Sequence, residues 1–248
     1  LYKSGRHADA AKAYARAIEL TPTDGESYFG LGNAHDKLGE AEQAASAFAS
    51  TLALDPTDSS AMYNLANAYR TLGRTGEAVG HYRGALKATP RNAAMHANLG
   101  HTLDASGAFS EAASSFTTAL SIAPKDVATY TALGHTYKSA GLTEKAVEAY
   151  KAALALEPNA AGAYAGLGTA LKQIDPKAAA EAFTAAAQGG GTGPEAEGAK
   201  AFRAWLGASP PPPPLPSARK GGPRAWSAVQ AAARYPEAFE GRARACAE

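Results

Sequence analysis

Apolar and small residues recur along this chain with a period of 34 residues. In the clearest copy, residues 127–160, a first helical face is followed by a glycine, a second helical face and a proline. The residues of these faces are Tyr130, Leu133, Gly134 and Tyr137 for the first, and Ala146, Tyr150 and Ala153 for the second. Apolar residues spaced three and four positions apart are typical of amphipathic helices. Each period therefore predicts two helices joined by a tight turn.

The same pattern divides residues 1–188 into repeats. We predict a half repeat over 1–24, whose helix covers 7–20, followed by repeats at 25–58, 59–92, 93–126, 127–160 and 161–188. The last repeat departs from the pattern, because its turn is one residue short and the pair Asp175-Pro176 replaces the glycine. Since the chain begins inside a repeat, we expect further repeats before Leu1 in the natural protein.

Start and stop signals agree with this periodicity. A glycine separates the two helices of each of four repeats, and glycine readily takes the left-handed conformation that ends a helix. An Asp or Asn stands before each of the same repeats, where its side chain can accept hydrogen bonds from the first helical turn. These residues are Gly39, Gly73, Gly107 and Gly141 for the turns, and Asp24, Asp58, Asn92 and Asp126 for the caps.

Two further repeat positions indicate how the helices pack. One holds only small residues, which allow close helix approach: Gly32, Ala66, Gly100, Gly134 and Gly168. The other holds aromatic residues that we expect to fill the space between neighbouring repeats: Phe48, Tyr82, Phe116 and Tyr150.

This arrangement resembles the tetratricopeptide repeat family, whose signature is an aromatic residue, Leu-Gly, a second aromatic residue, Ala-x-x-x-Phe and a proline at period 34. The resemblance implies an all-α fold, a right-handed superhelical solenoid of antiparallel helix pairs. It also implies protein–protein interaction, with the first helix of each repeat lining a concave groove.

Composition excludes several other classes of function. No apolar run approaches the roughly 18 residues that a membrane helix needs, so we expect no membrane insertion. The formal net charge is +1. Residues 1–198 carry 16 Lys and Arg against 20 Asp and Glu, and residues 199–248 carry 8 against 3. Neither part has the concentrated basic face of a nucleic-acid-binding protein.

No catalytic or metal-binding constellation stands out. The six histidines, His7, His35, His81, His96, His101 and His135, lack zinc-ligand spacing and a nucleophile partner. We interpret His35 and His96 as packing residues. The lone Cys246 excludes an internal disulfide and favours an intracellular location, in the cytoplasm or nucleus. We therefore predict a chain that is not an enzyme and needs no cofactor or metal.

By the family resemblance, several polar side chains of the first helices face the groove. The candidates are Asn33, Tyr63, Asn64, Asn67, Arg70, Asn98, His101, His135 and Lys138. Amide side chains can donate to and accept from the main chain of an extended peptide. We expect these positions to bind a partner peptide and to take no part in packing between repeats.

Two subfamilies can be compared with these positions. Chaperone-binding domains of this family also use cations, but the corresponding positions here are Ala94 and Asn98, or Ala128 and Ala132, which disfavours that role. Asn64 and Asn98 partly resemble the asparagine ladder of O-linked N-acetylglucosamine transferases. We predict a scaffold or adaptor that holds an extended peptide. The alternatives are the substrate-binding arm of such a transferase, or an assembly subunit that binds through its convex face or its open N-terminal end.

The C-terminal part has a different composition. We predict a Gly-rich linker at 189–194, a capping helix at 195–208, a polyproline and basic linker at 209–223, and a short helix and tail at 224–248. The run Pro213-Pro214-Leu215-Pro216 resembles the PPLP ligand of WW domains, and the five prolines before Leu215 resemble a profilin ligand. A stiff spacer is the alternative interpretation.

Overall fold

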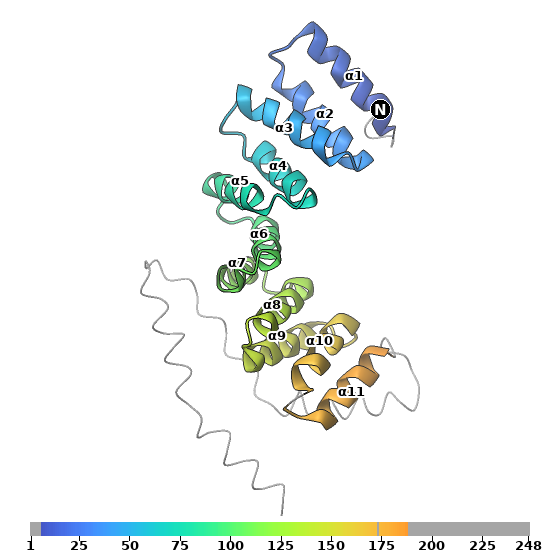
Figure 1. Cartoon of the computed structure of the whole chain (residues 1–248), viewed down its shortest axis with the longest axis vertical. Helices are drawn as coiled ribbons and strands as arrows, with labels where there is room; N and C mark the ends of the chain where they lie inside the picture. The colour runs from blue at the N-terminus through green and yellow to red at the C-terminus, as the bar shows by residue number, and fades with distance from the viewer. Residues whose placement is uncertain (1–5, 173, 188–248) are drawn as a thin grey trace, which may run out of the picture. The chain divides into compact units, whose positions relative to one another are not determined.

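The computed structural model describes residues 6–172 and 174–187 (Figure 1). The predicted linkers, the capping helix and the proline motif Pro213–Pro216 lie outside these residues, as does the start of the half repeat.

Eleven helices and no strand make up the described residues. They are α1 (His7–Leu20), α2 (Gly25–Leu38), α3 (Ala41–Leu54), α4 (Ser59–Thr71), α5 (Thr75–Ala88), α6 (Ala93–Ala105), α7 (Phe109–Ile122), α8 (Val127–Ser139), α9 (Thr143–Leu156), α10 (Ala161–Leu171) and α11 (Pro176–Ala187). Each helix packs against the next one along the chain, and α10 also contacts α8. The prediction of an all-α solenoid is confirmed. None of the helices in these ranges is long and apolar enough to cross a membrane.

The turn and cap predictions are confirmed at atomic level. The four turn glycines have φ between 72° and 78°, the left-handed region that favours glycine. The caps accept hydrogen bonds from backbone N–H groups of the following helix, as when Asp58 Oδ1 accepts from Ser60 at 2.8 Å and Ala61 at 3.0 Å. In the atypical last repeat Asp175 caps α11 instead, accepting from the N–H of Ala178 at 3.0 Å. Local signals therefore place each of these helix ends.

The aromatic residues lie between consecutive first helices. Tyr150 is fully buried, with Gly134 of its own repeat on one side and Gly166 of the next repeat on the other. A Cβ added at Gly134 would lie 2.6 Å from the ring, and one at Gly166 would lie 2.3 Å from it. Phe48, Tyr82 and Phe116 are buried in the same way. The core thus contains a row of buried aromatic rings, as the repeat pattern predicts, and the ring of Tyr150 is held between two glycines.

Candidate peptide-binding face

The sequence-predicted binding residues lie on the first helices of four repeats. Asn33 comes from α2, and Tyr63, Asn64, Asn67 and Arg70 come from α4. Asn98 and His101 come from α6, and His135 and Lys138 from α8. We call the polar side of α2, α4, α6 and α8 that carries these residues the first-helix face.

Hydrogen bonds join the first-helix face from one repeat to the next. They run from Asn64 Nδ2 to Asn33 Oδ1 (3.1 Å), from Asn98 Nδ2 to the Tyr63 hydroxyl (2.7 Å), and from Thr136 Oγ1 to Asp104 Oδ1 (2.7 Å). The bonds connect α2 with α4, α4 with α6, and α6 with α8. Side chains that are 31 to 35 residues apart therefore connect consecutive first helices, and of these side chains Thr136 is buried.

The expectation that these positions take no part in packing is wrong at four of them: Tyr63 and His101 pack against core aromatic rings, and Asn67 and His135 hydrogen-bond buried tyrosines. The hydroxyl of Tyr82 donates to Asn67 Oδ1, and the hydroxyl of Tyr150 hydrogen-bonds His135 Nδ1 at 2.9 Å. Both tyrosines are fully buried. A buried hydroxyl needs a partner, and here the first-helix face provides it. Asn67 and His135 therefore both line the face and satisfy the core.

His101 has a third kind of contact. It packs edge-on against Phe116 with ring centroids 4.9 Å apart, close to the arrangement of His135 on Tyr150 at 5.3 Å. Phe116 has no hydroxyl, so the His101 imidazole keeps both ring nitrogens for other partners.

Sequence reasoning missed three polar contributors to this face, namely Tyr82, Tyr150 and Thr136. Asp104 occupies a position that the resemblance assigns to the groove, although it is not among the binding candidates. The tyrosines had a signal in the sequence, because Tyr alternates with Phe at the aromatic position, and only tyrosine can present a hydroxyl there. Thr136 had none, because its bond to Asp104 spans 32 residues.

The interpretation of His35 and His96 as structural residues fits their contacts. His35 Nδ1 lies 2.5 Å from a carboxylate oxygen of Glu40, in the turn that ends α2. His96 Nε2 lies 3.0 Å from the backbone oxygen of Pro90. Each histidine thus contacts a neighbouring turn.

Burial shifts the titration of three other histidines. It lowers the pKa of His81, His101 and His135, in each case as the largest cause. The positive charge of Arg70 lowers the pKa of His101 further, and that of Lys138 does the same for His135. Burial also raises the pKa of the Tyr150 and Tyr82 hydroxyls. The imidazoles of the first-helix face are therefore uncharged at neutral pH.

These shifts predict that the solenoid loses stability in mild acid. An unfolded histidine has a pKa of about 6.5. Below that value the unfolded chain takes up protons that the folded chain does not, so the stability is complete above it. The stability is lost as the pH falls through about 6.5 toward the lowered folded values. We expect the melting temperature, followed by circular dichroism at constant ionic strength, to fall between about pH 7.5 and about pH 5.5.

The matched control replaces His81, His101 and His135 with glutamine. Its melting temperature should change less over the same range, because glutamine does not titrate. An equally steep fall in this variant would show that other groups cause it.

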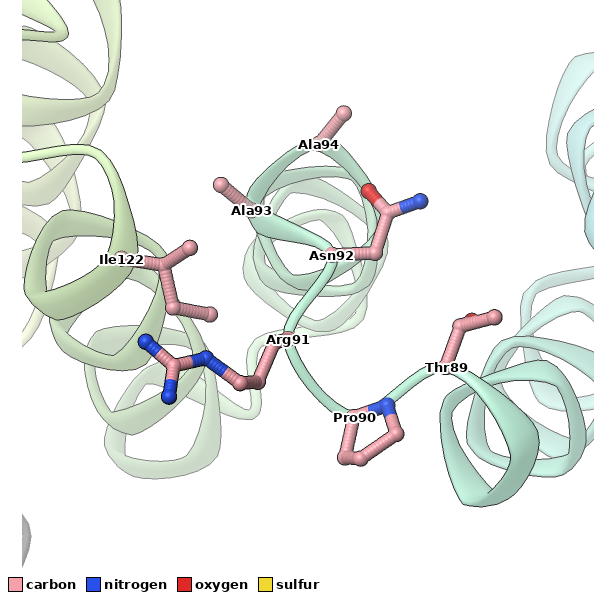
Figure 2. Close-up of a pocket in the computed structure, with 7 residues that line it drawn as sticks. All are labelled: Thr89, Pro90, Arg91, Asn92, Ala93, Ala94 and Ile122. Carbon is pink, nitrogen blue, oxygen red and sulfur yellow. The ribbon is translucent and has the colours of Figure 1, made fainter.

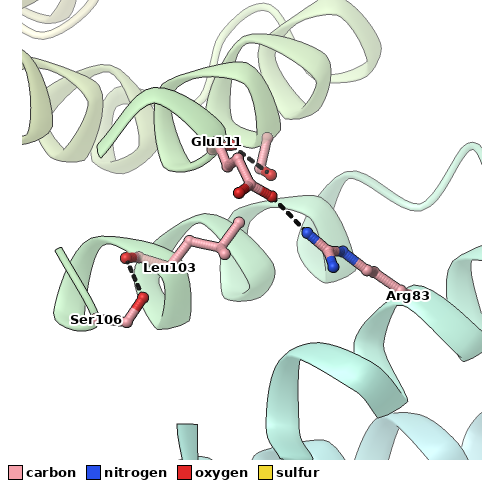
Figure 3. A network of polar contacts seen from close by, with 5 residues as sticks. Arg83, Leu103, Ser106 and Glu111 are labelled. Carbon is pink, nitrogen blue, oxygen red and sulfur yellow. Dashed lines mark hydrogen bonds and ion pairs between the residues drawn. The ribbon is translucent and has the colours of Figure 1, made fainter. Parts of the chain in front are cut away.

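Two other surface features lie outside the predicted residues. An open pocket of about 700 Å³ lies around the turn that leads into α6, lined by Thr89, Pro90, Arg91, Asn92, Ala93, Ala94 and Ile122 (Figure 2). On the second helices, Arg83 of α5 pairs with Glu111 of α7 (Figure 3). In the part of the chain that the structure describes, no cluster of three or more His, Cys, Asp or Glu residues could hold a metal ion.

The fold and this face define a helical repeat protein with an extended polar surface. A family model described as tetratricopeptide repeat matches residues 1–59 and 63–127, and one described as TPR repeat matches residues 134–175. The chain belongs to the tetratricopeptide repeat family, which confirms the resemblance seen in the sequence. No curated protein sequence matches it.

Solved structures of other repeat proteins share the fold. MamA is 25% identical, with 63% of this chain and 92% of MamA covered and a TM-score of 0.62. YrrB, described as a TPR protein with an unusual peptide-binding site, is 22% identical, with 79% and 100% covered and a TM-score of 0.63. The C-terminal part of a TPR repeat-containing protein from Cytophaga hutchinsonii is 18% identical, with 77% and 76% covered and a TM-score of 0.66. The last two likenesses show the fold alone. The family and the fold together support a protein-interaction scaffold.

Proposed function

We propose that this chain is a scaffold that holds an extended segment of a partner protein along the first-helix face. The observation that carries the proposal is the row of hydrogen bonds that joins Asn33 to Asn64, Tyr63 to Asn98 and Asp104 to Thr136. These bonds hold amides and hydroxyls of successive repeats in fixed positions, which lowers the entropy cost of binding a flexible chain.

The chemistry of the face suits a peptide main chain. Amide and hydroxyl groups that bond to one another keep further donor or acceptor capacity, because an amide has two donors and a two-lone-pair acceptor. An extended peptide carries one donor and one acceptor per residue and needs such partners along its length. The likeness to YrrB agrees with this proposal at the level of the fold.

The proposal is tested with a variant that removes the polar row without leaving unpaired groups. The groove variant carries Asn33→Ala, Asn64→Ala, Tyr63→Phe and Asn98→Ala. It deletes both partners of two hydrogen bonds, which avoids the cost of orphaning one of them. Phenylalanine keeps the ring of residue 63 against Tyr82, where the centroids are 5.9 Å apart.

The matched control carries three substitutions on second helices, at exposed positions: Gln43→Ala, Lys87→Ala and Ser114→Ala. Random dodecapeptides displayed on phage are selected on the immobilised full chain, and recovered peptides are measured by fluorescence anisotropy. We expect the groove variant to bind them at least tenfold more weakly, which corresponds to a loss of roughly 1.4 kcal/mol of binding free energy. The control should bind like the unchanged chain.

Other outcomes separate the alternatives. Peptides that bind the groove variant normally and lose affinity for the control would contradict the proposal and favour an assembly subunit that binds through the second helices. A transferase arm would use the same face, and a catalytic domain in the full-length protein would distinguish it.

A further inference from the structure

The repeats alternate between two kinds of side-chain pair. Where the inter-repeat aromatic residue is tyrosine, the first helix of that repeat carries a cation near its end. Where the aromatic residue is phenylalanine, the first helix carries an aspartate there, except in the last repeat, which has Phe183 with Lys172. The pairs are Tyr82 with Arg70, Tyr150 with Lys138, Phe48 with Asp36, and Phe116 with Asp104. Cations therefore occur on the first helices of the repeats whose aromatic residue is tyrosine.

Arg70 belongs to an ordered group of donors. It lies on one stripe of α4 with Tyr63 and Asn67, at spacings of four and three residues. The hydroxyl of Tyr82 donates a hydrogen bond to Asn67 Oδ1, and Arg70 lies close enough to lower the pKa of that hydroxyl against the larger effect of burial. Since an amide oxygen can only accept, the bond between Tyr82 and Asn67 has one direction. It occupies the acceptor of Asn67 and leaves the Nδ2 group as the part that Asn67 offers to a ligand.

The charge of Arg70 is not neutralised by a neighbouring carboxylate. Other arginines form pairs with glutamates, namely Arg16 with Glu19, Arg74 with Glu77 and Arg83 with Glu111 (Figure 3). Among the described residues, no carboxylate oxygen lies within 4.0 Å of the Arg70 guanidinium or of the Lys138 ammonium group. An arginine without a counter-ion is ready to bind an anion.

His101 of α6 adds to the same group from the next repeat. The charge of Arg70 lowers the pKa of His101 by more than either Asp104 or Asp126 raises it. Asp104 accepts a hydrogen bond from Thr136. Arg70 of α4 and His101 of α6 therefore lie close enough to interact electrostatically.

We propose that Arg70, Asn67 and His101 form an anion subsite on the first-helix face that takes an acidic side chain of the bound peptide. The inference rests on the proposed function and adds the class of partner, a segment with an anionic residue. Guanidinium pairs bidentately with carboxylate and with phosphate, so either aspartate or glutamate, or a phosphorylated residue, supplies the required chemistry. Lys138 with His135 and Tyr150 repeats the arrangement two repeats later.

The test compares two charge reversals in the full chain. Arg70→Glu changes the subsite, and Lys87→Glu changes an exposed cation of α5 in the same way. Random dodecapeptides are selected on each protein and on the unchanged chain. We expect the unchanged chain and Lys87→Glu to recover peptides that share an Asp or Glu at one position, and Arg70→Glu to lose that preference.

Synthetic versions of one recovered peptide then identify the group that binds. Glutamine in place of its acidic residue should weaken binding about tenfold, the effect of one hydrogen bond to a charged group. Phosphoserine at that position should restore binding, and the affinity for the acidic peptide should fall as salt is added. Arg70→Gln, which keeps a similar shape without the charge, should bind the acidic and glutamine peptides equally.

The failures of the two proposals are distinguishable. The inference alone is overturned if peptides are recovered and depend on the groove variant but show no acidic preference, or bind Arg70→Glu as well as the unchanged chain. Both proposals are overturned if no peptide is recovered, or if the recovered peptides bind the groove variant normally.

Discussion

Replacement of Phe116 with alanine is expected to lower the free energy of unfolding by about 3–5 kcal/mol, the usual cost of truncating a fully buried aromatic residue. Phe116 has no exposed surface and belongs to a core cluster that extends from Ala66 in α4 to Ala149 in α9. A Cβ added at Gly100 would lie 2.8 Å from its ring. Since the ring joins two consecutive repeats, alanine leaves a cavity at their interface. Urea denaturation followed by circular dichroism measures the loss.

Phe116→Tyr is the matched control, and we expect it to change stability little. Tyrosine occupies the equivalent position in the repeats of Tyr82 and Tyr150, where its hydroxyl reaches the first-helix face. The His101 ring packs edge-on against Phe116 in nearly the same way as the His135 ring packs against Tyr150. The new hydroxyl therefore has a partner available. A loss in Phe116→Tyr as large as that in Phe116→Ala would contradict this account of the packing.

Replacement of Gly134 with leucine should lower the free energy of unfolding by about 3 kcal/mol, at the upper end of the cost of overpacking a core. The first atom of the new side chain would already lie 2.6 Å from the ring of Tyr150. That ring cannot move away, because Gly166 lies against its other side. Alanine at residue 66 is the largest group found at this repeat position. Thermal melting of the variant is the measurement.

The same substitution at Gly80 should have the opposite sign. Gly80 is an exposed residue of α5, and a Cβ there meets no atom within 4 Å. Leucine is a better helix former than glycine by about 0.5–1 kcal/mol, so we expect a small gain in stability. If both leucines lowered the melting temperature equally, close packing at Gly134 would not be the cause.

Much of the fold could be predicted from the sequence because its signals are local and repeated. The turn at Gly107 depends only on the backbone conformation of that residue. The cap Asp126 accepts hydrogen bonds from Ala128 and Thr129, which are in the helix that directly follows it. Each copy of the pattern independently predicts the same kind of helix pair. The sequence thus predicted each helix, each turn and the burial of the aromatic residues.

The candidate site was predictable only in part. The 34-residue period identified which residues share the first-helix face, but not which atoms meet there. Asn67 was predicted as a binding residue that takes no part in packing, and the structure shows that it also accepts a hydrogen bond from the buried Tyr82 hydroxyl. A face can be inferred from spacing, whereas a hydrogen-bond partner depends on side-chain reach in three dimensions.

The sequence by itself determined the class of this protein, the order of its helices and the side of each first helix that carries polar groups, because these follow from nearest-neighbour packing within a repeat. Only the tertiary structure decided how those polar groups are connected. The bond from Asn98 to Tyr63 crosses 35 residues, and no local signal predicts it. No local signal predicts the pairing of charges either. Arg83 forms an ion pair with Glu111, whereas no described carboxylate lies close enough to pair with Arg70. Whether a charge is paired depends on which helices lie side by side.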